Sequence, residues 1–222
     1  MRRALAVAFL VSTVVCAMTM SAACGSPPKH PVPQTSSSST LSPAGISRVR
    51  AALPAGYEIG DLEGPVSAAG LWGFGAGWVA DPPPCMPLAD PAPTDRAARG
   101  LSASGRGGTI FVLVAAADGP PRPDVLSECG GWTMAFGHTI AEVTRTQNPS
   151  IAGADTLAWQ AVARTVVESG NATITHASGA VAYFDREVAV VILVTDPGSP
   201  HPPLDPGFAT GLLATTVTEL RR

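Results

Sequence analysis

The sequence predicts an α+β fold: an antiparallel sheet flanked by an N-terminal and a C-terminal helix, with one disulfide. Segments in the second half alternate between apolar and polar residues and are joined by short turns, which is typical of consecutive antiparallel strands. Apolar residues at helical spacing near both ends of residues 44–222 indicate the two helices. This region of about 180 residues is long enough for one domain with its own core.

The first half of this domain contains few strong secondary-structure signals. Residues 46–53 have apolar side chains at helical spacing, and Pro54 ends this predicted helix. Residues 60–104 are rich in Gly and Pro, so little regular structure is expected there. The other predicted elements are a strand opening at residues 57–59, a short helix near 66–71, a strand at 109–115 and a helical turn at 124–129.

The second half contains four predicted strands and a helix. Asp205 is a suitable N-cap and Pro206 a suitable first helical residue, so a helix should begin there. Residues 188–195 are the most apolar segment, which favours a central position in the sheet. The strands are expected at residues 139–146, 156–167, 172–184 and 188–195. The apolar stripe of the helix, which should cover the sheet, consists of Phe208, Leu212, Leu213, Val217 and Leu220.

The N-terminus has the features of an export signal that ends at a lipidated cysteine. Arg2 and Arg3 precede an apolar run, and small residues lead to Cys24. This resembles a bacterial lipobox, with Ser21 where Leu or Val is usual. We therefore expect a signal peptide over residues 1–23 and acyl chains such as palmitate on Cys24. Ordinary cleavage without lipid and an uncleaved membrane anchor remain as alternatives.

Residues 24–43 are dominated by Pro and Ser and contain almost no large apolar side chains. Such a segment cannot bury enough surface to offset the entropy of ordering, so we expect a disordered tether. With two or more acyl chains on Cys24, the domain would be held stably at the cell membrane, on its extracytoplasmic side. The membrane is therefore the first expected partner of this chain.

The cysteine count predicts one disulfide in the exported domain. Cys16 lies in the signal and Cys24 carries the lipid, which leaves Cys85 and Cys129 as an even pair in an oxidising compartment. A redox-active pair is not expected because no Cys-x-x-Cys occurs. A metal site is not expected either, because the two cysteines are far apart and no cluster of histidines accompanies them.

Charge and motifs indicate neither nucleic-acid binding nor catalysis. The chain has 14 Lys and Arg against 17 Asp and Glu, and the signal would remove Arg2 and Arg3. This acidic balance argues against nucleic acid as a partner. No Gly-x-Ser-x-Gly, His-Glu-x-x-His or phosphate-loop motif occurs, so no catalytic residue and no cofactor are predicted. An envelope hydrolase would require His138 or His176 to meet a carboxylate or nucleophile in space.

Aromatic residues are the remaining candidates for a binding site. Trp72, Phe74 and Trp78 crowd one Gly-rich loop, and Trp132 follows Cys129 by three residues. A disulfide would draw these regions together. They could line a cleft for a lipid, a glycan or the side chains of an envelope protein. Alternatively, they pack over the disulfide and fill a core that is short of large side chains.

Four segments and the tether together resemble a family of mycobacterial lipoproteins with an extracytoplasmic domain of unknown function. More distantly, the domain is similar to the extracellular sensor domain of the mycobacterial Ser/Thr kinase PknH, which has two disulfides where this chain has cysteines for one. The resemblance implies an exported α+β domain with Cys85 and Cys129 at matched positions, and no active-site residue. The segments are ALPAGYEI (52–59), LWGFGAGWVADPPPCMPLADP (71–91), SECGGWTM (127–134) and VTDPGSPHPPLDPGFATGLL (194–213).

These observations predict a membrane-anchored lipoprotein that acts as a non-enzymatic ligand-binding or sensor-like module of the cell envelope. The main alternative is a scaffold that binds another envelope protein through a sheet edge or through the Gly- and Pro-rich loops. A hydrolase is the third interpretation.

Overall fold

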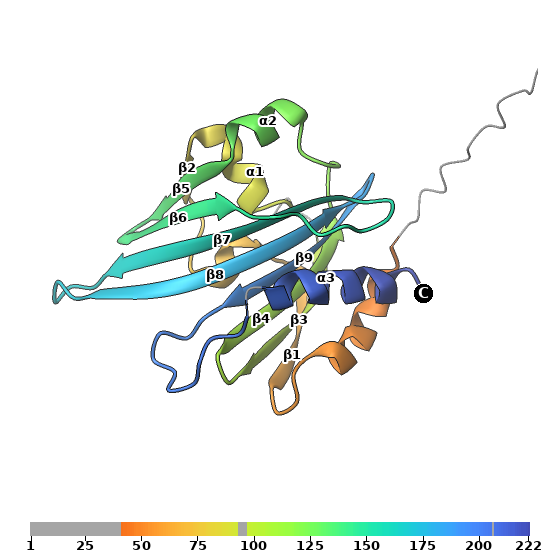
Figure 1. Ribbon diagram of the computed structural model, residues 1–222, viewed down its shortest axis with the longest axis horizontal. Helices are drawn as coiled ribbons and strands as arrows, with labels where there is room; N and C mark the ends of the chain where they lie inside the picture. The colour runs from red at the N-terminus through yellow and green to blue at the C-terminus, as the bar shows by residue number, and fades with distance from the viewer. Residues whose placement is uncertain (1–40, 93–96, 206) are drawn as a thin grey trace, which may run out of the picture. The chain divides into compact units, whose positions relative to one another are not determined.

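One antiparallel sheet of nine strands organises the residues that the structure describes, 41–92, 97–205 and 207–222 (Figure 1). The structure is a computed structural model. The strand order is β1-β3-β4-β9-β8-β7-β6-β5-β2, and all neighbouring strands are antiparallel. The strands are β1 (Glu58–Pro65), β2 (Val79–Asp81), β3 (Ala97–Gly105), β4 (Gly108–Ala116), β5 (Gly131–Phe136), β6 (Thr139–Arg145), β7 (Asp155–Val166), β8 (Ala172–Tyr183) and β9 (Glu187–Val194).

Short helices surround this sheet, and the longest of those described has 14 residues. The 3-10 helices are η1 (Pro43–Ala52), η2 (Ala69–Trp72) and η3 (Pro83–Cys85), and the α-helices are α1 (Met86–Ala89), α2 (Pro123–Glu128) and α3 (Gly207–Leu220). The described residues all belong to one compact unit, Ser37–Arg222. The predicted signal peptide, Cys24 and most of the tether lie outside the described residues.

The two faces of the sheet form two separate hydrophobic clusters. On one face, α3 and η1 pack over side chains such as Val191 and Leu193 of β9. On the other face, residues 66–92 pack over side chains such as Val190 and Ile192. Because β9 is buried on both faces, its sequence is almost continuously apolar rather than alternating. The α+β class is thus confirmed, and β9 lies inside the sheet between β4 and β8.

The predicted C-terminal helix is confirmed as α3, and its apolar stripe faces the sheet. Leu213 and Leu220 are fully buried. The Asp205 carboxylate accepts a hydrogen bond from the Gly207 N–H at 2.6 Å, as expected of a residue that caps the start of a helix. Pro206 lies outside the described residues. The structure contains no helix, within those residues, that is long and apolar enough to span a bilayer.

The N-terminal helix packs against α3 at the end where the predicted tether joins the domain (Figure 1). The Ser42 N–H donates to the Leu220 carbonyl oxygen at 2.7 Å, and the Leu41 N–H donates to the Glu187 carboxylate at 2.7 Å. Leu41 is buried. The folded domain therefore includes residues from Leu41 onward, three residues before the sequence-based boundary at Ala44.

Sequence analysis missed three strands, β2, β3 and β5. The nine residues of β3 are mostly small, and Gly100 explains why: a Cβ there would lie 2.2 Å from the Val112 carbonyl oxygen on β4. Small residues permit this close approach but provide no apolar alternation to recognise. The strand β2 has only three residues, and β5 directly follows the predicted turn at residues 124–129. Pairing with neighbouring strands, rather than local sequence, defines these elements.

Candidate functional site

The four aromatic residues predicted as a binding cleft are buried inside the cluster that lies under residues 66–92. Trp72, Phe74, Trp78 and Trp132 are at most 8% exposed. The Trp72 ring lies 4.6 Å from Phe74 and 5.2 Å from Trp159 between centroids. This packing supports the interpretation that the aromatic residues fill the core. A ligand-binding role for the four residues remains a prediction.

The predicted disulfide between Cys85 and Cys129 is confirmed, and it fastens this cluster. Both cysteines are fully buried. Cys85 ends η3 and Cys129 follows α2, so the bond ties residues 66–92 to the strand that carries Trp132. The antiparallel pairing of β2 with β5 joins the same two segments.

Several polar atoms in this aromatic cluster have no hydrogen-bond partner among the described residues. They are the indole Nε1 of Trp72, Trp132 and Trp159 and the hydroxyl of Tyr183. Burial raises the pKa of the Tyr183 hydroxyl, because the phenolate would be desolvated. These groups lie in a closed core, so they do not by themselves define a site.

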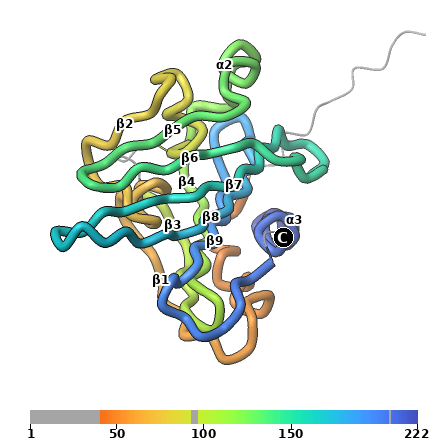
Figure 2. The backbone as a smooth tube through the Cα atoms, turned by 60° about the vertical axis from the view of Figure 1, so that its left-hand side comes forward, coloured from red at the N-terminus to blue at the C-terminus, as the bar shows by residue number. Residues whose placement is uncertain are grey.

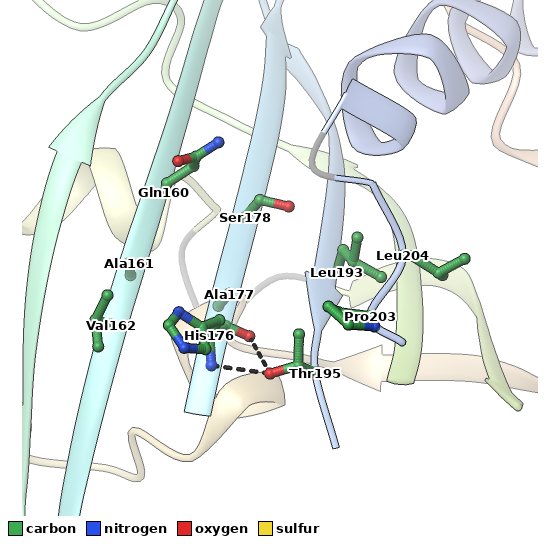
Figure 3. Close-up of a pocket in the computed structure, with 10 residues that line it drawn as sticks. All are labelled: Gln160, Ala161, Val162, His176, Ala177, Ser178, Leu193, Thr195, Pro203 and Leu204. Carbon is green, nitrogen blue, oxygen red and sulfur yellow. Dashed lines mark hydrogen bonds between the residues drawn. The ribbon is translucent and has the colours of Figure 1, made fainter. Parts of the chain in front are cut away.

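A cavity of about 300 Å³ opens on the opposite face of the sheet, beside the start of α3 (Figure 3). Strand β7 supplies one wall, β8 and β9 supply the floor, and the loop before α3 supplies the other wall. The lining residues are Gln160, Ala161, Val162, His176, Ala177, Ser178, Leu193, Thr195, Pro203 and Leu204. None of them is Asp, Glu, Lys or Arg, so the cavity has apolar walls with a few neutral polar groups.

Strand register places these polar groups next to one another. Gln160 on β7 pairs with Ser178 on β8, and His176 lies two residues before Ser178, so all three face the same side of the sheet. Ser178 is 7% exposed, yet its hydroxyl makes no hydrogen bond to any described residue. The amide of Gln160 and the imidazole of His176 likewise have no partner within the described ranges.

The edge of the cavity near Thr195 is held by a network of backbone hydrogen bonds. The His176 N–H donates to Thr195 Oγ1 at 2.9 Å, and the Thr195 hydroxyl donates to the His176 carbonyl oxygen at 3.1 Å (Figure 3). The Thr195 N–H donates to that same oxygen at 2.8 Å. These bonds continue the pairing with β8 by one residue beyond the end of β9. They also occupy the Thr195 hydroxyl with backbone groups, so we do not expect it to bind a ligand.

The loop that forms the outer wall is positioned by a glycine. Gly107 has φ of +89°, and a Cβ there would lie 2.7 Å from the Pro202 carbonyl oxygen and 3.1 Å from the Leu204 nitrogen. The turn between β3 and β4 therefore packs directly against the backbone of residues 202–204. Leu204 also packs on the cluster under α3, which fixes the wall against the core.

No histidine side chain in the described part of the chain is hydrogen-bonded to a nucleophile or a carboxylate. His138 and His201 are exposed at other places, and His30 lies outside the described residues. His176 and Ser178 share the cavity, but no hydrogen bond joins the imidazole to the hydroxyl, and none of the described residues that line the cavity carries a carboxylate to orient the imidazole. Nucleophilic catalysis would need both contacts. No group of three or more His, Cys, Asp or Glu within the described ranges is placed to hold a metal ion.

Sequence reasoning missed this cavity because its wall comes from a distant segment. His176 lies within a strand among small and polar neighbours, a pattern that does not by itself indicate a binding site. The alternation of β7 and β8 could have placed Gln160, His176 and Ser178 on one face, but only with the register known. The approach of Pro203 and Leu204 depends on tertiary packing against Gly107.

Together, these observations define an α+β domain with one disulfide, a closed aromatic core and a small cavity beside its C-terminal helix. The chain belongs to the family described as domain of unknown function DUF5642, whose model matches residues 42–221. Among solved structures, it is similar to an uncharacterized protein from Mycobacterium smegmatis, the Rv0999 ortholog. The TM-score is 0.62 at 17% identity, over 82% of this chain and 98% of that chain. This similarity shows the fold alone. No curated protein matches the chain.

Proposed function

We propose that this chain is a lipid-anchored extracytoplasmic module that binds a small ligand without transforming it. The cavity beside α3 carries the proposal: it is large enough for a small molecule, mainly apolar, and contains the Ser178 hydroxyl, which has no hydrogen-bond partner among the described residues. Binding sites commonly combine apolar walls with a few convergent polar groups. The missing contacts to His176 favour binding over hydrolysis.

The anchoring part of the proposal is supported by the sequence before the domain. An apolar run after Arg2 and Arg3, small residues before Cys24, and a Pro- and Ser-rich stretch follow one another in the order of a lipoprotein. Leu41 is the first described residue of the domain, and the stretch from Cys24 to Leu41 could span roughly six nanometres at full extension. The cavity would then face the envelope, where lipids and glycans are available.

Native mass spectrometry of the chain from Ser37, exported and purified from a mycobacterial host, tests the proposal. We expect a reproducible bound mass. A Val162→Trp variant, which places an indole at the mouth of the cavity, should abolish it. Ile140→Trp is the matched control, because Ile140 is exposed on the same face but does not line the cavity. If the protein carries no ligand and acquires none from an envelope extract, ligand binding at this cavity is excluded.

An interaction with another envelope protein is the second candidate, and a different observation favours it. Four aliphatic side chains, 42–58% exposed, lie on the same face of the sheet as α3 but beyond the part that α3 covers: Val79, Ile140, Val162 and Ile174. Val79, Ile140 and Ile174 lie in one row across neighbouring strands. The strand pairs that form the row are Val79–Ala135, Ala135–Ile140, Ile140–Arg164 and Arg164–Ile174. Exposed apolar patches often mark protein contacts.

Photo-crosslinking in intact cells tests this second candidate. A crosslinking amino acid at position 140 should yield one discrete protein adduct. The same residue at position 168, in the exposed turn between β7 and β8, should yield none. Equal or absent adducts at both positions would argue against a protein partner on this face.

A further inference from the structure

We infer that the cavity takes a neutral, elongated apolar molecule that ends in a single hydroxyl or carbonyl oxygen, held by Ser178 and Gln160. This inference rests on the proposed function and specifies its ligand class. It is argued from four properties of the cavity: its charge, its polar groups, its walls and its volume.

The absence of charged lining residues argues for a neutral ligand. His176 is the only ionisable side chain among the ten that line the cavity. Arg164 and Glu142 are exposed on the same face, but neither contributes to the lining. Ser178 is buried at the floor of the cavity, whereas Gln160, Val162, His176 and Pro203 on its walls are exposed. A carboxylate or ammonium group placed against Ser178 would lose part of its hydration without gaining an opposite charge, which disfavours binding.

The pair Ser178 and Gln160 specifies the polar end of the ligand. These residues are directly opposed on β8 and β7. Ser178 is more than nine-tenths buried and its hydroxyl has no partner within the described residues, so an oxygen from a ligand would satisfy it. A hydroxyl and an amide can each donate and accept, so the pair can hold either an alcohol or a carbonyl.

The remaining walls specify an apolar body. Val162, Leu193 and Leu204 contribute branched aliphatic side chains, and Pro203 contributes its ring (Figure 3). The cavity of about 300 Å³ is roughly twice the 150 Å³ of an engineered apolar cavity that holds benzene. It therefore has room for about 12 non-hydrogen atoms on the same scale. A linear ten-carbon chain with one oxygen fits these requirements.

A matched series of decyl probes tests the inference. The chain from Ser37 retains both hydrophobic clusters and the disulfide, so it contains the contacts that hold the fold together. It is titrated, without detergent, with 1-decanol, decanoate and decylammonium, and amide shifts are followed by NMR. We expect saturable shifts in β7, β8 and residues 193–204 with 1-decanol, and affinities at least about tenfold weaker for both charged probes.

Variants connect the effect to the two named side chains. Ser178→Ala and Gln160→Leu should each weaken 1-decanol binding about three- to tenfold. Thr173→Ala, on β8 beyond the cavity, is the matched control and should leave the affinity unchanged. Circular dichroism of each variant verifies that it is folded.

The outcomes separate the ligand class from the proposed function. Decanoate or decylammonium binding as tightly as 1-decanol would overturn the neutral class, and so would unchanged affinity in both Ser178→Ala and Gln160→Leu. A second outcome is that no decyl probe binds, but native mass spectrometry detects a bound mass that Val162→Trp abolishes. This outcome would overturn the ligand class and leave the proposed binding function in place. Failure of both experiments would overturn both.

Discussion

Trp159 shows how one glycine determines the packing of the aromatic core. It pairs with Gly179 across β7 and β8, and a Cβ on Gly179 would lie 2.3 Å from two carbons of the indole. The indole therefore lies over the glycine backbone, where any larger residue would displace it. Trp72 then stacks on Trp159 at 5.2 Å between centroids, so the displacement would spread through the cluster.

We therefore expect Gly179→Ala to lower the free energy of unfolding by about 1–3 kcal/mol, as overpacked cores do. Urea denaturation followed by tryptophan fluorescence measures the change. Gly211→Ala is the control: this exposed helical position has no atom within 4 Å of the added Cβ, so a gain of about 0.5–1 kcal/mol is expected. Equal effects of the two substitutions would contradict the close approach of Trp159.

Asp90 connects two parts of the segment that covers the aromatic core. Its carboxylate accepts hydrogen bonds from the Ser67 hydroxyl at 2.5 Å and from the Ala68 N–H at 2.8 Å. Burial raises the pKa of the carboxyl, and this effect exceeds the opposing effect of the hydrogen bonds. The folded protein therefore holds the Asp90 proton more tightly than the unfolded chain.

This shift predicts a pH dependence of stability. The contribution of Asp90 is fully present below its unfolded pKa of about 4, and it is lost as the pH rises through the raised folded pKa. Asp90→Asn has no carboxyl to titrate, so its free energy of unfolding should not fall between the unfolded and folded pKa values of Asp90. The stability of the variant relative to wild type should therefore rise with pH between those two values. Urea titrations at several pH values measure it. Ser67→Ala should move the window to higher pH, and a flat difference would contradict the raised pKa.

At the scale of elements, the disulfide compensates for weak local structure in residues 66–92. This segment contains only short helices and the three-residue strand β2, so the Cys85–Cys129 bond adds to the few restraints that hold it: packing, the pairing of β2 with β5, and the hydrogen bonds of Asp90. A covalent link over 44 residues of sequence restricts the unfolded chain considerably.

We expect Cys85→Ala combined with Cys129→Ala to cost about 4 kcal/mol by the loop-entropy estimate. The chain from Ser37 has no other cysteine, so reduction of the wild-type chain is the matched experiment. Both should give similar losses in denaturant titrations. A loss below about 1 kcal/mol would mean that packing and hydrogen bonds hold the segment without help from the disulfide.

Arg145 provides a second link between elements. Its Nη1 donates to the Leu126 carbonyl oxygen of α2 at 2.6 Å, and its own N–H donates to the Gly130 carbonyl oxygen. A cation at the C-terminal end of a helix offsets its unpaired carbonyl groups. The turn that carries Cys129 is thereby fixed against β6.

At the scale of the whole molecule, the sheet has different surroundings on its two faces. The aromatic face is closed by residues 66–92. The other face is covered by α3 and η1 only over part of its width, as Figure 2 shows from a second side. The cavity lies where that cover ends. A fold of this kind can offer a ligand site without opening its core.

The lipid anchor is a prediction about the entire chain. Cys24→Ala should shift the protein from the membrane fraction to the soluble envelope fraction, because stable attachment requires the acyl chains. Cell fractionation with immunoblotting measures the shift. Cys16→Ala is the control and should change nothing, since Cys16 lies in the predicted signal. A Cys24→Ala protein that stays in the membrane would favour the uncleaved anchor.

Local sequence was sufficient to predict the strands β6–β9 and the helix α3, because β6, β7 and β8 alternate, β9 is a continuous apolar run, and α3 repeats at helical spacing. The disulfide followed from the cysteine count. The strand β3 and the cavity were not predictable in this way. Gly100 and the small residues of β3 become strand only by pairing with β4, and Pro203 becomes a cavity wall only because Gly107 admits the loop. Contacts between residues far apart in the chain leave no periodic signal, so they are visible only in the folded molecule.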